Sequence, residues 1–101
     1  MNDKETMTAE QFGEEGLPDW SWRDDALHAH FETGDFVTGV RLVNLIGEAA
    51  ESMNHHPDLD LRYPHLDVRL SSHDAGGVTA RDVKLARTIS EQAAGEGVRA
   101  G

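Results

Sequence analysis

Two adjacent histidines followed by a proline, His55, His56 and Pro57, form the stretch of this chain with the clearest chemical potential. A third histidine, His73, lies in the short polar run "LSSHDAGG". Imidazole donates or accepts a proton near pH 7, because its unperturbed pKa is about 6.5. Three rings brought together therefore predict either acid–base chemistry or a metal site.

A long helix is expected directly before the histidine pair. Apolar residues after the segment "ETGD" recur at intervals of three and four, which predicts an amphipathic helix running to about Ser52 and packing on a sheet. Pro57 disfavours helical geometry at His56, so the helix should end just before the pair. The apolar stripe consists of Phe36, Val40, Val43, Ile46, Ala50 and Met53.

Two strands are expected after the histidine pair. Apolar and polar residues alternate from Leu59 to Tyr63 and again from Leu66 to Leu70, the pattern of strands with one buried face. His73 has the parity of the polar residues and stands at the end of the second strand. If these two strands pair, the three histidines can reach one edge of the sheet.

The remaining elements follow from caps and periodicity. Thr8 with Gln11 predicts a short first helix, and Thr79 with Asp82 predicts a last helix running to about Ala93. Alternation around the turn "DD" predicts a hairpin with Leu27, Ala29 and Phe31 on its buried face and His28 and His30 on its polar face. The order is helix, two strands, helix, two strands, helix. We expect an α+β fold in which helices pack on one face of a four-stranded antiparallel sheet.

The chain length fits one domain with a modest core. We expect that domain at residues 8–94, because residues 1–7 and 95–101 carry too few apolar side chains to offset the entropy of ordering and should be flexible tails.

Composition limits the classes of partner and of metal site that the chain can have. The formal net charge of −10 argues against nucleic acid and membrane surfaces, and the absence of cysteine excludes disulfides and thiolate metal sites. The polar start has no basic segment leading into an apolar one, and no segment could span a bilayer, so we expect a cytoplasmic protein.

Simpler interpretations apply to each of these residues. Histidine pairs are more often surface or structural than catalytic, and the chain has no ligand spacing such as HExxH, so the zinc pattern is weak. Trp20, Trp22 and Tyr63 are expected in the core, and Thr79 with Asp82 is expected to act as a cap. Composition and spacing alone thus lead only to a histidine-rich edge on a small α+β domain.

A resemblance extends this interpretation. The segment "ESMNHHPDLDLRY", followed after nine residues by His73 and after eight more by Asp82, closely resembles the signature of the pterin-4a-carbinolamine dehydratases. Glu51, four residues before His55, and Tyr63, which closes the next strand, also match. The similarity covers roughly residues 17–93.

The resemblance implies a lyase that removes water from 4a-hydroxytetrahydrobiopterin to give the quinonoid dihydropterin, as in tetrahydrobiopterin recycling, without a metal or an organic cofactor. Departure of the 4a hydroxyl is helped by its protonation, and formation of the C=N bond requires loss of the proton on N5. One histidine must therefore donate a proton while another accepts one.

The resemblance also implies roles for single residues. His55 and His73 would perform acid–base work on opposite sides of the ring, with His56 orienting the pterin and sharing in proton transfer. Glu51 would fix the His55 tautomer or bind the amino-pyrimidine edge. Further substrate contacts are implied for Asn54, Pro57, Ser72, Asp74 and Ala75, and Asn54 stands where some relatives carry an acid.

Alternatives remain open at this stage. Members of the family also act as binding partners or assembly scaffolds, which need not retain all three histidines, although a bifunctional protein would keep them. A domain that binds metal through His55, His56 and His73 is a further possibility. The resemblance implies a homodimer or homotetramer, while the pterin side chain and the hydroxylase that would supply the substrate are not specified by the sequence.

Overall fold

The computed structural model describes residues 5–101 and has the α+β architecture that the sequence predicts. The predicted order of elements is confirmed, and one short strand follows it. The helices are α1 (Ala9–Gly13), α2 (Phe36–Met53) and α3 (Ala80–Gly95), and the strands are β1 (Ser21–Arg23), β2 (Ala26–Glu32), β3 (Asp58–Arg62), β4 (His65–Leu70) and β5 (Arg99–Ala100). None of the described helices has the length and apolar composition needed to cross a membrane.

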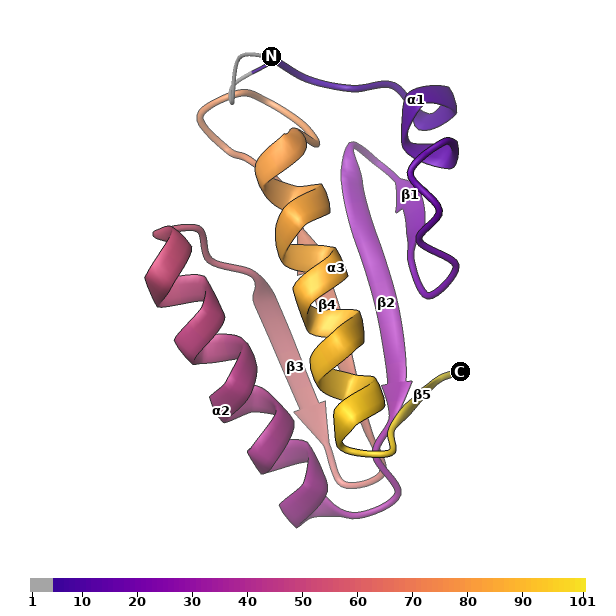
Figure 1. Cartoon of the computed structure of the whole chain (residues 1–101), viewed down its shortest axis with the longest axis vertical. Helices are drawn as coiled ribbons and strands as arrows, with labels where there is room; N and C mark the ends of the chain where they lie inside the picture. Colours follow the sequence, from indigo (N-terminus) through magenta and orange to yellow (C-terminus); the bar gives the residue numbers. More distant parts are fainter. Residues whose placement is uncertain (1–4) are drawn as a thin grey trace.

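The strands form one antiparallel sheet in the order β1-β2-β4-β3, with β5 paired to the end of β2. Helices α2 and α3 lie side by side across one face of this sheet (Figure 1). Alternate strand residues point to the opposite side, which we call the open face. Its residues are Ser21, Arg23, His28, His30, Glu32, Asp58, Asp60, Arg62, His65, Asp67 and Arg69.

The hairpin of β1 and β2 turns at Asp24 and Asp25, as the sequence predicts. Both residues have left-handed backbone angles, with φ values of 52° and 57°. Two consecutive left-handed residues are typical of the type I′ turn, whose twist matches that of the flanking strands. The turn therefore fixes the register that buries Leu27, Ala29 and Phe31.

The core fills the space between the sheet and the two long helices. Leu27 and Phe31 of β2, Leu66 and Leu70 of β4 and Ile89 of α3 are each fully buried. At about 25 cal/mol per Å² of apolar surface, burial of this kind is the main term stabilising the fold. The expected core position of Trp20 is confirmed: it is 5% exposed, and its Nε1 donates to Ser90 Oγ at 2.9 Å.

The buried line of α2 differs from the predicted stripe. Asp35 caps the helix by accepting from the Thr38 N–H at 2.8 Å, and the buried line then consists of Gly39, Leu42, Ile46 and Ala50. The prediction was wrong for Phe36, which is 50% exposed because the start of α2 projects past the end of β3 (Figure 1). Gly39 was not expected in this line. It allows a close approach to β3, since a Cβ there would meet Leu61 Cδ1 at 2.5 Å.

The structure also differs from the expectation of core packing for Tyr63. This ring is 67% exposed, because β3 ends at Arg62 and Tyr63 lies in the turn before β4. The alternation of apolar and polar residues predicted the strand but did not show where it stops. The expectation for Tyr63 was therefore wrong.

The segment 95–101, expected to be a flexible tail, packs against the sheet. Gly97 adopts a left-handed angle of 72°, after which Val98 is buried, and Arg99 and Ala100 pair with Glu32 and Phe31. One buried valine and two strand residues give too weak a sequence pattern to indicate this. Of the expected N-terminal tail, residues 1–4 lie outside the described residues, and the Met7 N–H donates to the Val78 carbonyl at 2.8 Å.

Candidate active site

The end of α2 turns His55 into the protein. Asn54 closes the helix in the left-handed conformation (φ 50°, ψ 45°), and the His55 N–H donates to the Ala50 carbonyl at 3.1 Å. The chain then reverses towards Pro57, and the His55 residue is only 7% exposed. The sequence placed the histidine pair at a helix end, and the structure adds that the two rings lie in different environments.

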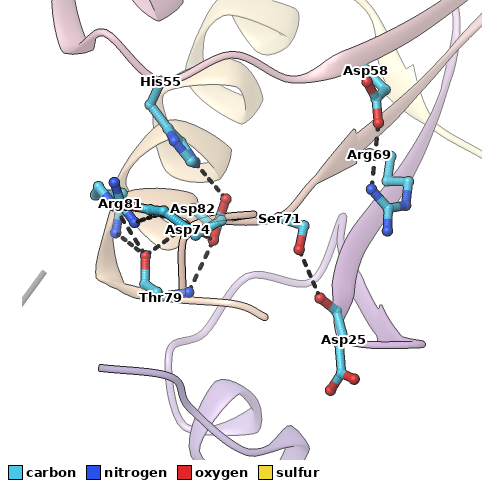
Figure 2. A network of polar contacts seen from close by, with 10 residues as sticks. Asp25, His55, Asp58, Arg69, Ser71, Asp74, Thr79, Arg81 and Asp82 are labelled. Carbon is cyan, nitrogen blue, oxygen red and sulfur yellow. Dashed lines mark hydrogen bonds and ion pairs between the residues drawn. The ribbon is translucent and has the colours of Figure 1, made fainter. Parts of the chain in front are cut away.

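A buried carboxylate holds the His55 ring. Asp82, at the start of α3, has no exposed surface, and its Oδ1 lies 2.6 Å from His55 Nε2 (Figure 2). A carboxylate accepts hydrogen bonds, so His55 donates from Nε2. The Nδ1 atom of a neutral ring with this tautomer carries a lone pair and can accept a proton.

Two further donors complete the surroundings of Asp82. Its Oδ2 accepts from the Ser72 hydroxyl at 2.7 Å and from the Thr79 N–H at 2.9 Å. Thr79 and Asp82 also form the capping box of α3, which confirms the cap that the sequence predicts. The N-terminus of α3 is the positive end of the helix dipole, which favours a negative charge at this position. Asp82 is thus a capping residue and the partner of His55 at once.

His56 lies on the outside of this network. Its Nε2 contacts Glu51 Oε2, and the two side chains are 56% and 77% exposed. The family resemblance implies that Glu51, one helical turn before His55, fixes the His55 tautomer or binds the substrate. The turn at Asn54 instead directs the His56 ring to Glu51.

His73 follows Ser72 in the loop between β4 and α3. Ser72 is 1% exposed, its carbonyl accepts from the N–H groups of Ala75, Gly76 and Gly77, and its own N–H donates to the Gly77 carbonyl. His73 itself is exposed, and within residues 5–101 no hydrogen bond or ion pair reaches its ring. The structure therefore brings His55 and the His73 loop together through Ser72 and Asp82.

The other residues predicted to contact the substrate differ in their exposure and in their hydrogen bonds. Asn54 is exposed at the helix end, Pro57 and Ala75 are half-buried, and Asp74 is exposed and bonded to Arg81 at 2.7 Å. Ser72, expected to contact the substrate, has its hydroxyl and both backbone groups engaged within the protein. Its geometry is that of a positioning residue.

Asp82 and Arg81 were not predicted from the sequence as site residues. Asp82 was recognised as a cap, and its spacing after His73 was the available signal for a second role. Arg81 donates to Asp74 Oδ1 at 2.7 Å and to Thr79 Oγ1 at 3.5 Å (Figure 2), and its side chain is 24% exposed. A cation in the first turn of a helix is disfavoured by the dipole, so its presence there was a signal for a specific partner.

The contacts of the site histidines can be compared with the alternative that His55, His56 and His73 bind a metal ion. His55 is bound to Asp82 and His56 contacts Glu51. Among residues 5–101, the group with metal-ligand spacing consists of His30, His65 and Asp67 on the open face. The candidate active site is better described as a histidine and carboxylate network.

The chain as a whole is similar to known proteins. The family model described as pterin 4 alpha carbinolamine dehydratase matches residues 3–92. A relative from Nocardia farcinica is 40% identical over 93 residues, covering 92% of this chain and 94% of its own, and one from Aquifex aeolicus is 40% identical over 77 residues, covering 76% and 78%. Both bear the name pterin-4-alpha-carbinolamine dehydratase as a provisional assignment.

A solved structure is also similar. It is a transcriptional coactivator/pterin dehydratase from Brucella melitensis, with a TM-score of 0.83 and 30% identity, covering 88% of this chain and 99% of that one.

Proposed function

Because the chain belongs to the pterin 4 alpha carbinolamine dehydratase family, we propose that it dehydrates 4a-hydroxytetrahydrobiopterin to the quinonoid dihydropterin and water. The observation that supports this proposal most directly is the His55–Asp82 pair. A buried carboxylate that fixes the tautomer and orientation of a histidine favours acid–base catalysis by the free ring nitrogen.

The reaction needs one proton to reach the departing hydroxyl and one proton to leave N5. We assign these transfers to His55 and His73, with His56 mainly orienting the pterin and sharing in proton transfer. His55 is the better defined of the two groups, since its Nε2 donates to Asp82 and its Nδ1 is left as the atom to exchange a proton with the substrate. Each such group commonly contributes about 10²–10⁴-fold in rate.

Binding contacts are proposed on both sides of the histidines. Glu51, Asn54 and Pro57 lie at the end of α2 and just beyond it, and Asp74 and Ala75 lie in the loop after β4. Backbone groups and a few polar side chains suffice to orient a flat heterocycle. No metal or organic cofactor enters the proposed reaction, and we propose the cytoplasm as its location.

Self-association is part of the proposal. Strand β3 is an edge of the sheet and pairs with β4 alone among the described strands, so the backbone groups on its other side are available to a second chain. Phe36, Val37 and Tyr63 add exposed apolar area. We propose a homodimer or homotetramer; light scattering that gives an 11.1 kDa particle at micromolar concentration would contradict this.

The dehydration assay tests the enzymatic proposal directly. Chemically generated 4a-hydroxytetrahydrobiopterin is followed with and without the protein, and we expect catalytic acceleration. A folded protein that leaves the dehydration rate unchanged would rule the enzyme out.

A second candidate function is protein binding without catalysis. The similar Brucella melitensis structure is described as a transcriptional coactivator/pterin dehydratase, so both functions are attached to that protein. A folded chain without dehydratase activity that still binds a protein partner would favour this second function.

A further inference from the structure

We propose that His30, His65 and Asp67 form a binding site for one divalent transition-metal ion, with zinc as the probe ion. The site lies on the open face of the sheet and shares no residue with the candidate active site. It does not depend on the proposed dehydratase activity.

The strand register places the three side chains together. His30 of β2 pairs directly with Asp67 of β4, so their side chains stand opposite each other on the same face. His65 precedes Asp67 by two residues on β4 and therefore points to the same side. Three potential ligands thus come from two hydrogen-bonded neighbouring strands.

The distances suit a shared ion. His30 donates from Nδ1 to Asp67 Oδ1 at 2.6 Å, and His65 Nε2 lies 3.4 Å from Asp67 Oδ2. The two imidazole rings are 4.6 Å apart between centroids with a 36° tilt. One ligand atom from each residue lies within 4.8 Å of the others. Ligands of a tetrahedral zinc ion are separated by about 3.3 Å, so small side-chain rotations are enough to form the site.

The ligand types match zinc and related ions. Two imidazoles and one carboxylate form the three-ligand set of zinc sites that keep a further position for water or another ligand. The side chains of His30, His65 and Asp67 are 40%, 31% and 45% exposed, so an ion can reach them from solvent. His30 and Asp67 also line a hollow of about 540 Å³ on the open face.

The surrounding charges permit a cation at this position. Arg62 of β3 pairs with His65 in the register and would repel an ion, but its guanidinium is bound to Asp60, with contacts of 2.9 and 3.4 Å. Asp60 in turn pairs with Asp67 across β3 and β4. With a net charge of −10, the chain as a whole attracts cations.

Binding should have two physical signatures. An ion held by residues of β2 and β4 links two neighbouring strands and raises the midpoint of thermal unfolding, because it binds the folded state preferentially. The imidazoles must be neutral to act as ligands, so binding should weaken as the pH falls from 7.5 to 5.5.

The test uses the complete chain without a histidine tag. Calorimetric titration with Zn²⁺ at pH 7.5 should give one ion per chain, and His30→Ala, His65→Ala and Asp67→Asn should each weaken binding by at least about tenfold, since loss of an outer-shell partner alone costs ~10–100-fold. His28→Ala is the matched control, because His28 lies on the same strand and the same face. It should bind Zn²⁺ like the unmodified chain.

Several results would overturn the proposal. The first is that the chain binds no stoichiometric Zn²⁺. The second is that folded His30→Ala or Asp67→Asn binds Zn²⁺ as tightly as the unmodified chain. The third is that binding is lost in His55→Ala or His73→Ala instead. A Zn²⁺-dependent rise of the unfolding midpoint that persists in His30→Ala/His65→Ala would overturn it as well. Circular dichroism confirms the folding of each variant. Comparison of the His30 and His65 variants with the His55 and His73 variants distinguishes a site on the open face from one at the candidate active site.

Discussion

His55 Nε2 lies 2.6 Å from Asp82 Oδ1, although 27 positions separate the two residues. The same carboxylate caps α3 and accepts from Ser72 in the loop that carries His73. The orientation of one candidate catalytic ring and the conformation of the loop next to the other therefore depend on a single buried side chain.

Replacing this carboxylate should affect both rate and stability. In Asp82→Asn, one carboxylate oxygen becomes an NH₂ group facing hydrogen-bond donors. We expect the free energy of unfolding to fall by about 1–3 kcal/mol, the cost of unsatisfied buried groups. We also expect turnover to fall by about 10- to 100-fold, a part of what a positioned acid–base group contributes. Dehydration kinetics and urea unfolding measure the two effects.

Asp60→Asn is the control for that experiment, because Asp60 is an exposed carboxylate on the open face. It should leave turnover unchanged. Equal losses in Asp60→Asn and Asp82→Asn would show that Asp82 has no specific effect on the reaction.

The three histidines should separate chemistry from binding. If His55 and His73 transfer protons, His55→Ala and His73→Ala should lower kcat more than they raise KM, whereas His56→Ala should also weaken binding. The double variant His55→Ala/His73→Ala should lose far more than either single one if the two groups partly replace each other. The kinetics are measured on the separated 4a stereoisomers; full activity in the folded double variant would place the site elsewhere.

The buried line of α2 can be tested by a pair of truncations. Ile46 is fully buried and Phe36 is 50% exposed, although both belong to the predicted stripe. Ile46→Ala should lower the free energy of unfolding by ~2–5 kcal/mol. Phe36→Ala should cost less than about 0.5 kcal/mol, as expected for a surface position of the single chain. Urea unfolding at concentrations where the chain is monomeric decides this; equal costs would mean that the helix faces the sheet differently.

The C-terminal segment should contribute to stability. Val98 is 7% exposed and precedes β5, while Arg99 is exposed. Val98→Ala removes two methyl groups from a buried environment and should cost about 1–2 kcal/mol, at ~0.8 kcal/mol for each buried carbon. Arg99→Ala serves as the control and should be nearly neutral. If Val98→Ala left the free energy of unfolding unchanged, residues 95–101 would be better described as the flexible tail expected from the sequence.

His28 should make the fold sensitive to mild acid. Burial and the nearby positive charge of Arg23 lower the pKa of His28 from its ordinary value of 6.5. Between that lowered pKa and 6.5 the unfolded chain binds more protons than the folded chain, so stability falls as the pH decreases through this window. His28→Gln should therefore lose less stability than the unmodified chain between pH 7.5 and 5.5. Urea midpoints at the two pH values provide the measurement, and an equal loss in both proteins would contradict it.

Much of the fold was predictable because its determinants are local. The alternation of Leu27, Ala29 and Phe31 fixes a strand, and the capping box of Thr79 and Asp82 fixes a helix start, within a few residues each. Phe36 and Tyr63 were predicted wrongly for related reasons: periodicity gives the face of an element but not where that element, or the one it packs on, ends. The short strand β5 has too few residues to show a period.

The candidate site was predictable only in part for the same reason. The spacing of His55, His56 and His73 identified the residues through a family resemblance, and the helix end was read from Pro57. The partnership of His55 with Asp82 is a contact between distant segments, which spacing does not specify. Glu51 contacts His56 and not His55 because of the left-handed angle at Asn54, a detail that only the folded chain shows.

The division of the sheet into a helix-covered face and an open face has an evolutionary consequence. Substitutions among the charged residues of the open face leave the apolar packing on the other side intact, so they carry little risk of unfolding. A lineage can therefore gain, alter or lose a ligand-binding property on that face while each intermediate sequence still folds. Residues such as Asp82, which cap a helix and orient a ring, have no such freedom.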